Sequence, residues 1–427
     1  VSVEEISQES ILTIQQNLDN DLGGLVPINA IYGSKMYRIV YETLDGFGDS
    51  TLASGVMAIP DSQVESFGIV SWQHGTQIYR QGVQSNSGFD ILSRAISSTG
   101  YVYIAPDYVG LGISEDIHPY IIKNPSADSV IDLIRAVRNY FEDDVFKALN
   151  DQLFLIGYSE GGYATLAAQM VIEQELSDEF NITMSFPMAG PYDLSGTMVD
   201  KMLDDNLYGE PFYLPYLIYS YITYYDIMGS VEDYFLPDFV EVIHEQYGGD
   251  YGASFLNNYM NENNYNPPKL CMKTDVINEF ESNQNHVLRQ VLSNNDLFDW
   301  TPQSTTYLFH ALGDELIPYQ NSEVAYNTFI NNGSLSVYLE LLPESYGGHQ
   351  AAAPYAILTA YSIIEQIKEI NYKGDVNSDL VIDISDIIVV INFIINLIDD
   401  FDDYELWASD YTSDIIIDIL DIVSIVN

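Results

Sequence analysis

The motif Gly157-Tyr158-Ser159-Glu160-Gly161-Gly162 constrains the fold of this chain more than any other feature, because of the segments around it. An apolar run at residues 153–156 precedes it, and a segment with helical character, residues 163–176, follows it. Glycines two residues before and after a serine are typical of a strained turn between a strand and a helix, where larger side chains would collide with both elements. Such a turn lifts the serine hydroxyl clear of the sheet. A short motif of this kind also arises by chance, so whether Ser159 is a nucleophile depends on the groups available to activate it.

Downstream motifs supply an acid and a base in a characteristic order. A predicted strand at residues 305–312 leads into Asp314, and a predicted strand at 335–342 is followed by Gly347-Gly348-His349. A serine hydroxyl becomes a good nucleophile when an imidazole takes its proton, and a carboxylate then orients and stabilises the imidazolium. Serine, acid, histidine is the chain order of α/β-hydrolases. We therefore predict a triad of Ser159, Asp314 and His349, with Asp193 as the alternative acid.

The segment Gln73-His74-Gly75-Thr76 follows a predicted strand at residues 67–72 and matches a loop that binds a developing oxyanion. Backbone amides donate the hydrogen bonds to such an oxyanion, so the predicted donors are the amides of Thr76 and of Glu160. In comparable sites each donor stabilises the transition state by roughly 3 to 4 kcal/mol. His74 precedes the serine and lies in this loop. We expect it to make structural hydrogen bonds rather than to act as the base.

Taken together, the motifs at residues 72–76, 105–112, 157–162 and 313–318 resemble the secretory-lipase-like branch of the α/β-hydrolases. The resemblance covers residues 30–368. It implies a mostly parallel central sheet flanked by helices, and a secreted serine carboxylic ester hydrolase (esterase or lipase) that needs no cofactor for catalysis. Glu160 departs from the pattern, since relatives often carry glutamine at this position.

The predicted hydrolase domain, residues 1–372, contains a long insertion at residues 195–300 that we interpret as a largely helical cap or lid. Within it, residues 208–225 are rich in tyrosine. Tyrosines provide apolar area with a hydroxyl at the rim, which suits the wall of a site for an acyl or aromatic group. The predicted substrate-binding residues are Tyr213, Leu217, Tyr221 and Tyr225. The alternative is a helix that packs its apolar side on the body.

Residues 373–427 form a second predicted unit, a small all-α module with two similar acidic loops, of which the second begins 35 residues after the first. Oxygen-bearing residues stand at the spacing that can wrap Ca²⁺. The predicted ligands are Asp375, Asn377, Asp379, Val381, Asp383 and Asp386 in the first loop, and Asp410, Thr412, Asp414, Ile416, Asp418 and Asp421 in the second.

The two loops resemble a type I dockerin, which implies structural calcium and a cohesin-type partner. Leu380 and Ile415 stand where the sharp turn favours glycine, and Thr412 is a weaker ligand than Asn377. We therefore expect calcium at the first loop before the second. The alternative is a solvated acidic tail, although simple charge runs do not repeat with ligand spacing.

The composition of the chain limits the kinds of partner that it can bind. The chain has 63 acidic and 14 basic residues, a formal net charge of −49. A surface of this sign repels nucleic acid and anionic membranes, and suits a saline environment where the self-repulsion is screened. No apolar stretch is long enough for a membrane span. Cys271 is the sole cysteine, so no intramolecular disulfide forms. We expect a secreted, extracellular protein.

Other functions remain open at this stage. A serine peptidase on the same fold would use the same triad, although no propeller-like repeats precede the hydrolase segment. A binding protein on an inactive hydrolase scaffold is a further alternative, with the C-terminal module as its working part. Lipids, plant cell-wall esters and polyesters are all candidate substrates, the latter two for an esterase attached to a cohesin scaffold.

Overall fold

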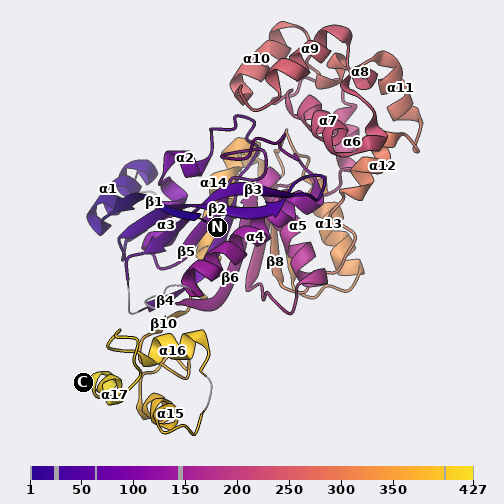
Figure 1. Ribbon diagram of the computed structural model, residues 1–427. Coiled ribbons are helices and arrows are strands. Elements are labelled where there is room, and N and C mark those ends of the chain that lie inside the picture. Colours follow the sequence, from indigo (N-terminus) through magenta and orange to yellow (C-terminus); the bar gives the residue numbers. More distant parts are fainter. Residues whose placement is uncertain (1, 24–27, 63–64, 143–147, 399–400, 427) are drawn as a thin grey trace.

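The computed structural model describes residues 2–23, 28–62, 65–142, 148–398 and 401–426 (Figure 1). Within these residues ten strands form a single sheet in the order β1-β2-β3-β5-β4-β6-β7-β8-β9, with β10 paired to the start of β4. The strands are β1 Ser2–Glu9, β2 Ser34–Leu44, β3 Ser50–Pro60, β4 Glu65–Gln73, β5 Val102–Pro106, β6 Leu149–Tyr158, β7 Met184–Met188, β8 Thr305–Ala311, β9 Val337–Leu342 and β10 Ile370–Tyr372.

The sheet is antiparallel at one side and parallel through its centre. Strands β1, β2, β3 and β5 pair antiparallel in that order, whereas β4, β5, β6, β7, β8 and β9 form the parallel part. Parallel strands need crossover connections, and helices supply them here. The carboxyl ends of β4, β6, β8 and β9 therefore lie along one edge of the sheet, where an open α/β sheet binds its ligands.

Helices cover both faces of this sheet. The helices of the body are α1 Ile11–Leu22, α2 Gln84–Ser87, α3 Ile91–Ser98, α4 Lys123–Glu142, α5 Glu160–Glu175, α13 Gln320–Asn331 and α14 His349–Ile364. Apolar side chains of α4 and α5 pack on one face in a core with Ile69 and Leu153. Those of α14 pack on the other face with Val70 and Phe154. Consecutive residues of β4 and β6 thus point to opposite faces, as the period of a strand requires.

The long segment between β7 and β8 is helical. It contains α6 Thr197–Met202, α7 Tyr213–Tyr224, α8 Val231–Tyr234, α9 Pro237–Gln246, α10 Ala253–Glu262, α11 Thr274–Ser282 and α12 Val287–Asn294. These helices sit together at the end of the molecule opposite the C-terminus (Figure 1). Eight of the twelve residues of α7 are buried, so this tyrosine-rich helix packs between the cap and the body rather than on the surface.

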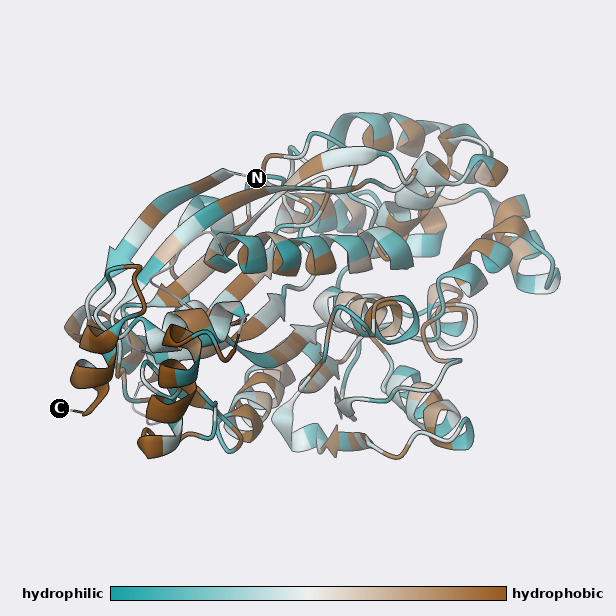
Figure 2. Cartoon of the chain, turned by 60° about the horizontal axis from the view of Figure 1, so that its bottom comes forward, coloured by the Kyte–Doolittle hydropathy of each residue, from teal (hydrophilic) through white to brown (hydrophobic). Residues whose placement is uncertain are grey.

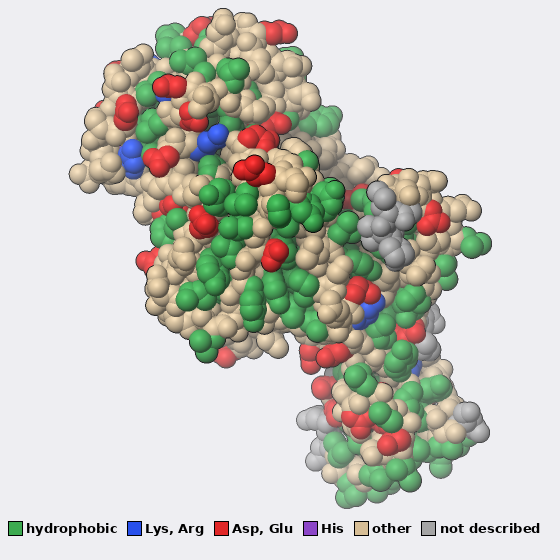
Figure 3. Space-filling model, turned by 180° about the vertical axis from the view of Figure 1, so that it is seen from behind, with side chains coloured by type: hydrophobic (Ala, Val, Ile, Leu, Met, Phe, Trp, Pro, Cys, Tyr) green, Lys and Arg blue, Asp and Glu red, His purple; other side chains and the backbone are tan. Residues whose placement is uncertain are grey.

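The C-terminal residues form a small separate cluster of helices, α15 Ile384–Ile394, α16 Asp403–Ser409 and α17 Ile419–Val426. Its core is small, with Val376, Val390, Trp407 and Ala408 buried against Ala148 of the body. Figure 2 shows that α15 and α17 are strongly hydrophobic, and Figure 3 shows hydrophobic side chains on the surface of this unit. Nevertheless, no helix among the described residues is both long and apolar enough to cross a membrane.

Candidate active site

Ser159 lies at the turn between β6 and α5, with a backbone φ of 64° that non-glycine residues rarely adopt. The neighbouring glycines explain how the turn fits. A Cβ at Gly157 would collide with the carbonyl oxygen of Gly161, and a Cβ at Gly161 with that of Gln73 on β4. The backbones of the turn, α5 and β4 are in direct contact, so the Gly-x-Ser-x-Gly pattern follows from packing. Strained serines of this kind mark functional sites.

The predicted triad residues form one continuous hydrogen-bonded chain. The Nε2 of His349 lies 2.9 Å from the Ser159 hydroxyl oxygen. Its Nδ1 lies 2.6 Å from Oδ2 of Asp314. Ser159, Asp314 and His349 follow β6, β8 and β9, so the sheet edge brings together residues that are far apart in the chain. This arrangement can transfer the serine proton to the imidazole and stabilise the resulting positive charge.

Asp314 is held by more than His349. Its Oδ1 accepts hydrogen bonds from the amides of Leu316, at 3.0 Å, and Ile317, at 2.8 Å. The Nε2 of His310 lies 3.2 Å from its Oδ2. Burial alone would raise the pKa of Asp314, but hydrogen bonds from His310 and His349 outweigh burial and hold the pKa well below its usual range. The carboxyl is therefore ionised at neutral pH, as an orienting acid must be.

The two residues kept as alternatives have other contacts. Both carboxylate oxygens of Asp193 are engaged at the start of α6, where they accept the amides of Gly196, at 3.0 Å, and Thr197, at 2.8 Å. His74 contacts the carbonyl oxygens of Gly75, at 2.8 Å, and Asp107, at 3.4 Å. Neither residue contacts Ser159 or His349 within the part of the chain that the structure describes.

The predicted oxyanion loop lies against the nucleophile. A Cβ placed on Gly75 would be 3.6 Å from the Cβ of Ser159. Thr76 follows directly, and its hydroxyl lies 3.0 Å from that of Tyr120. Glu160 is the first residue of α5, where helical geometry leaves the amide without an intrahelical acceptor. The loop that carries Thr76 and the helix start that carries Glu160 thus both lie next to Ser159.

An apolar pocket lies between the cap and the site. Its lining includes Tyr213 and Leu217 of α7, together with Tyr120 and Ile317. Neither the predicted triad nor the predicted oxyanion loop lines this pocket, but Tyr120 contacts Thr76 and Ile317 donates to Asp314, so the pocket is one residue away from both. Two of the four predicted substrate-binding residues therefore line it.

Tyr221 and Tyr225, the other two predicted substrate-binding residues, do not line this pocket. Tyr221 is fully buried and its hydroxyl donates to the carbonyl of Ile121 at 3.0 Å, while the Tyr225 hydroxyl lies 3.3 Å from Oδ1 of Asn295. Tyr221 thus packs against the body, as the alternative interpretation of the tyrosine run expected, whereas Tyr225 contacts Asn295 within the cap. Residues four apart share a helix face, so helical spacing alone did not separate the turns of α7 that line the pocket from the last turn, which packs.

Sequence reasoning also missed two histidines. His310 stands four residues before Asp314 on β8, and that spacing is the only signal for it. His118 lies in the loop after β5, and its Nε2 is 2.6 Å from Oε1 of Glu160. No local motif marks His118 as part of the site.

The two C-terminal loops share one backbone conformation. Leu380 and Ile415 have φ values of 67° and 69°, the left-handed turn that usually takes glycine. In the first loop, Oδ2 of Asp375 accepts the Leu380 amide at 2.9 Å, and Oδ1 of Asp386 accepts that of Val376 at 2.7 Å.

The second loop has similar contacts, with Thr412 in the position of Asn377, whose amide also donates to Oδ1 of Asp386, at 3.1 Å. Oδ2 of Asp410 accepts the Ile415 amide at 3.1 Å, and Oδ1 of Asp421 accepts the Thr412 amide at 2.9 Å. The Nζ of Lys373 lies 2.6 Å from the Asp410 carbonyl, so an ammonium group already stands beside this loop.

The predicted ligands of each loop are near one another in sequence, but their carboxylates are turned to the loop amides. Among the described residues, no group of three or more His, Cys, Asp or Glu side chains is arranged to hold a metal ion. Asp375 and Asp386 are nonetheless fully buried. Burial raises the pKa of Asp375, and the neighbouring carboxylates Asp386 and Asp379 raise it further. A cation would relieve this repulsion.

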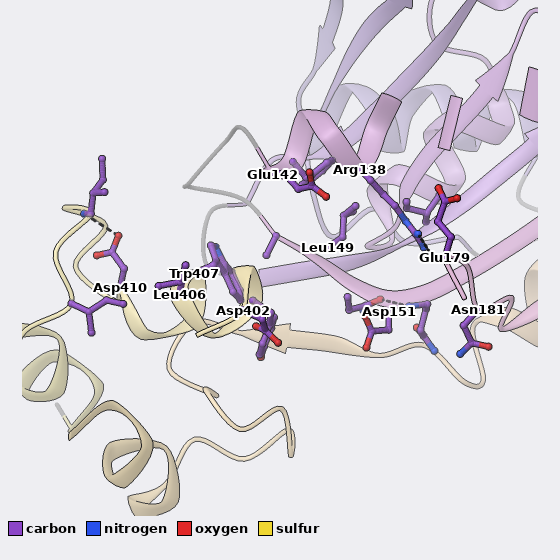
Figure 4. A pocket seen from close by; sticks show the side chains of 18 residues that line it. Arg138, Glu142, Leu149, Asp151, Glu179, Asn181, Asp402, Leu406, Trp407 and Asp410 are labelled. Carbon is purple, nitrogen blue, oxygen red and sulfur yellow. Dashed lines mark hydrogen bonds between the residues drawn. The ribbon is translucent and has the colours of Figure 1, made fainter. Parts of the chain in front are cut away.

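A cavity of about 590 Å³ lies between the body and the C-terminal unit. Figure 4 shows Leu406 and Trp407 of α16 on one side, and Leu149, Asp151 and Glu179 of the body on the other. No triad residue lines this cavity, so its size does not make it the catalytic centre.

The fold and the position of the site are those of an α/β-hydrolase. Comparison with known proteins agrees: the family model described as secretory lipase matches residues 73–184. This segment contains the predicted oxyanion loop and the turn at Ser159. No match to a curated protein is found.

Solved structures extend the similarity over most of the chain. A ligand-bound form of the rice cell wall degrading esterase LipA from Xanthomonas oryzae is 27% identical, with a TM-score of 0.74 over 85% of this chain and 95% of that chain. A putative hydrolase from Legionella pneumophila is 26% identical, with a TM-score of 0.77 over 86% and 97%. Candida antarctica lipase A in its closed state is 15% identical, with a TM-score of 0.59 over 86% and 81%, and shows the fold alone. Together these matches support an α/β-hydrolase related to esterases and lipases.

Proposed function

We propose that this chain is a secreted serine carboxylic ester hydrolase that acts through an acyl-enzyme on acyl or aromatic esters. The observation that carries the proposal is the unbroken contact from Ser159 through His349 to Asp314, at 2.9 and 2.6 Å. The similarity to secretory lipases and to the LipA esterase supports esters rather than amides as substrates. No comparable feature favours the peptidase alternative.

In this mechanism the Ser159 oxygen attacks the ester carbonyl carbon while Nε2 of His349 takes the hydroxyl proton. The carbonyl oxygen becomes an oxyanion, which accepts hydrogen bonds from the amides of Thr76 and Glu160. His349 then gives its proton to the departing alkoxide, which leaves as the alcohol. A water molecule, deprotonated by His349, releases the acid from Ser159, and the proton returns to the serine. Each step uses groups of this chain and water.

Ser159→Ala tests this assignment. The variant lacks the nucleophile but loses only one small polar atom, so we expect a folded protein whose turnover of a short-chain p-nitrophenyl ester falls to background. Active-site labelling with a fluorophosphonate should mark the wild type and not the variant. Wild-type turnover by Ser159→Ala would overturn the proposal.

A plant cell-wall ester is a second candidate substrate. It is favoured by the similarity to LipA, a protein described as degrading rice cell walls. The C-terminal unit adds to this, because it resembles dockerins, which attach enzymes to scaffolds. Release of ferulate or acetate from insoluble cell-wall material, measured beside triglyceride hydrolysis, distinguishes the two substrates.

For the C-terminal unit we propose structural calcium, bound first at residues 375–386, and a cohesin-type partner. The support is the repeated loop conformation and the fully buried pair Asp375 and Asp386. Residues 375, 377, 379, 381, 383 and 386 would hold the ion after the carboxylates release their loop amides. Lys373 beside the second loop makes that loop the weaker candidate.

The same unit exposes large apolar side chains on α15 and α17, for example Ile384 at 70% and Ile419 at 67%. Exposed apolar surface of this kind marks an interaction site. Titration calorimetry with calcium, followed by binding to an isolated cohesin domain with and without chelator, tests both parts. If no heat of calcium binding is measured, the calcium proposal is wrong. If chelator leaves cohesin binding unchanged, the partner binds without calcium.

A further inference from the structure

The residue after the nucleophile is engaged in a buried contact that the reaction scheme does not use. Oε1 of Glu160 lies 2.6 Å from Nε2 of His118, and the two side chains are 3% and 4% exposed. The backbone amide of the same Glu160 is a donor of the proposed oxyanion hole. Any group that fixes the Glu160 side chain therefore also fixes the beginning of α5.

The protons of this pair can be counted from its contacts. Nδ1 of His118 lies 2.7 Å from the carbonyl oxygen of Val109, which only accepts, so Nδ1 carries a hydrogen. The short contact between Nε2 and Oε1 needs one further hydrogen. Whether that hydrogen belongs to the imidazole or to the carboxyl, the pair has zero net charge. Without His118, an ionised Glu160 would leave an unpaired buried negative charge on the residue that follows Ser159, whose amide is a proposed oxyanion donor.

The surroundings hold the pair rigidly. The ring of His118 stacks on Tyr108, with ring centroids 5.8 Å apart, and lies 6.1 Å from both Tyr120 and Tyr216. The other carboxylate oxygen of Glu160, Oε2, is buried and has no hydrogen-bond partner among the described residues. His118 is thus the sole hydrogen-bonding contact of this carboxylate within the described chain.

The same cluster reaches the second oxyanion donor. Tyr120, which packs against His118, has its hydroxyl 3.0 Å from the Thr76 hydroxyl. One set of contacts therefore runs from the Glu160 side chain through His118 and Tyr120 to the loop that carries the Thr76 amide. A single buried cluster thus contacts the side chains of both residues that carry the proposed donor amides.

We propose that His118 is a positioning residue of the oxyanion hole, which anchors Glu160 and keeps its side chain electrically neutral while negative charge forms on the substrate. The inference rests on the proposed ester hydrolysis. It assigns a role to the glutamate that distinguishes this chain from relatives with glutamine. It also predicts that the effect of losing His118 depends on the charge at position 160.

The experiment compares His118→Leu, Glu160→Gln and the double variant in the p-nitrophenyl ester assay. We expect His118→Leu to lower kcat at least 30-fold with KM changed less than threefold, because the charge acts on the transition state. Glu160→Gln should lower kcat by a smaller factor, about threefold, since an amide still donates to Nε2. The double variant should recover at least tenfold over His118→Leu, because it removes the unpaired charge.

His244→Leu is the matched control, because this histidine is 53% exposed on the cap helix α9. Should His118→Leu fail to fold, Glu160→Ala is compared with Glu160→Gln: loss of the anchor should cost Glu160→Ala at least tenfold more kcat. A double variant as impaired as His118→Leu, or equal kcat for Glu160→Ala and Glu160→Gln, would overturn the proposal. Failure of the ester hydrolase assignment is seen separately, as wild-type activity that survives Ser159→Ala.

Discussion

The turn at Ser159 and the loops at the C-terminus place non-glycine residues in the same left-handed backbone region but hold them by different means. Ser159 has a φ of 64°, Leu380 of 67° and Ile415 of 69°. At Ser159 the strain is held by backbone packing, with Gly157 and Gly161 in contact with their neighbours and no room for a Cβ. At Leu380 and Ile415 it is held by carboxylates that accept the amides of these residues.

The backbone conformation at Ser159 therefore depends on packing, whereas that at Leu380 and Ile415 depends on the neighbouring carboxyl groups. Left-handed conformations cost about 1 to 3 kcal/mol each and persist where the surroundings compensate. The buried sheet compensates at Ser159, so the catalytic turn should not depend on calcium or salt. The carboxyl groups of Asp375 and Asp410 compensate in the loops by accepting amides, so those loops should respond to cations and to pH.

The largest effect is expected at the buried acid Asp314. Replacing it tests whether the catalytic region depends only on packing and on this acid. Asp314→Asn should lower kcat by roughly 10⁴, because an amide favours the wrong tautomer of His349. Asp193→Asn is the matched control: this residue caps α6, so kcat should fall less than tenfold, with some loss of thermal stability. Steady-state kinetics on both variants decides, and a larger loss of kcat for Asp193→Asn would assign the acid role to Asp193.

A second test concerns the pocket under the cap. If Leu217 lines the acyl site, Leu217→Trp should shorten the preferred acyl chain and lower kcat/KM for an eight-carbon ester about tenfold, while a two-carbon ester changes little. Each buried methylene contributes ~0.8 kcal/mol to binding, which makes chain length a sensitive probe. Kinetics over acyl lengths from two to twelve carbons measures the optimum.

Tyr225→Phe serves as control for that series, because its hydroxyl contacts Asn295 away from the pocket. Its chain-length profile should match that of the wild type. An unchanged optimum in Leu217→Trp would remove the pocket from substrate binding.

A third test uses the opposite pKa shifts of two acids. The pKa of Asp314 is lowered by its histidine contacts despite burial, so its contribution to stability is present above the unfolded value of about 4 and is lost only as pH falls further. The pKa of Asp375 is raised by burial and neighbouring acids, so without calcium its contribution is lost as pH rises through its folded value.

Between pH 5 and 8 the contribution of Asp314 to stability should therefore stay constant, whereas that of Asp375 should fall. After correction for the faster base-catalysed intrinsic exchange at pH 8, we expect the amides of residues 375–386 in chelated protein to be less protected at pH 8 than at pH 5. Calcium should restore the protection, while kcat at pH 8 is unaffected by chelator. Hydrogen exchange beside ester kinetics measures both. Loss of activity on chelation would mean that the turn at Ser159 and the C-terminal loops depend on each other.

Sequence reasoning predicted the elements that carry strong local signals. The turn at Ser159 and the strand ends before Asp314 and His349 were readable because glycines, apolar runs and catalytic residue types coincide there. His118 and His310 were not, since each acts through a contact set by the fold, with Glu160 and Asp314, and neither stands in a motif. The sequence did not distinguish Tyr213 from Tyr221 on α7 for a related reason: residues eight apart lie on nearly the same helix face, and only packing shows which turn lines the pocket.

The smallest expected effect concerns the left-handed residue of the first loop. Leu380 is 53% exposed, so truncating its side chain costs little burial, but any Cβ there pays for the left-handed backbone. Leu380→Gly removes that strain and should stabilise the loop by about 1 kcal/mol relative to Leu380→Ala, after the entropy of glycine in the unfolded chain is subtracted. Without calcium, the amides of residues 375–386 should then exchange about fivefold more slowly in the glycine variant. Equal exchange in the two variants would mean that the loop carries no strain, and that its resemblance to the turn at Ser159 is one of dihedral angle alone.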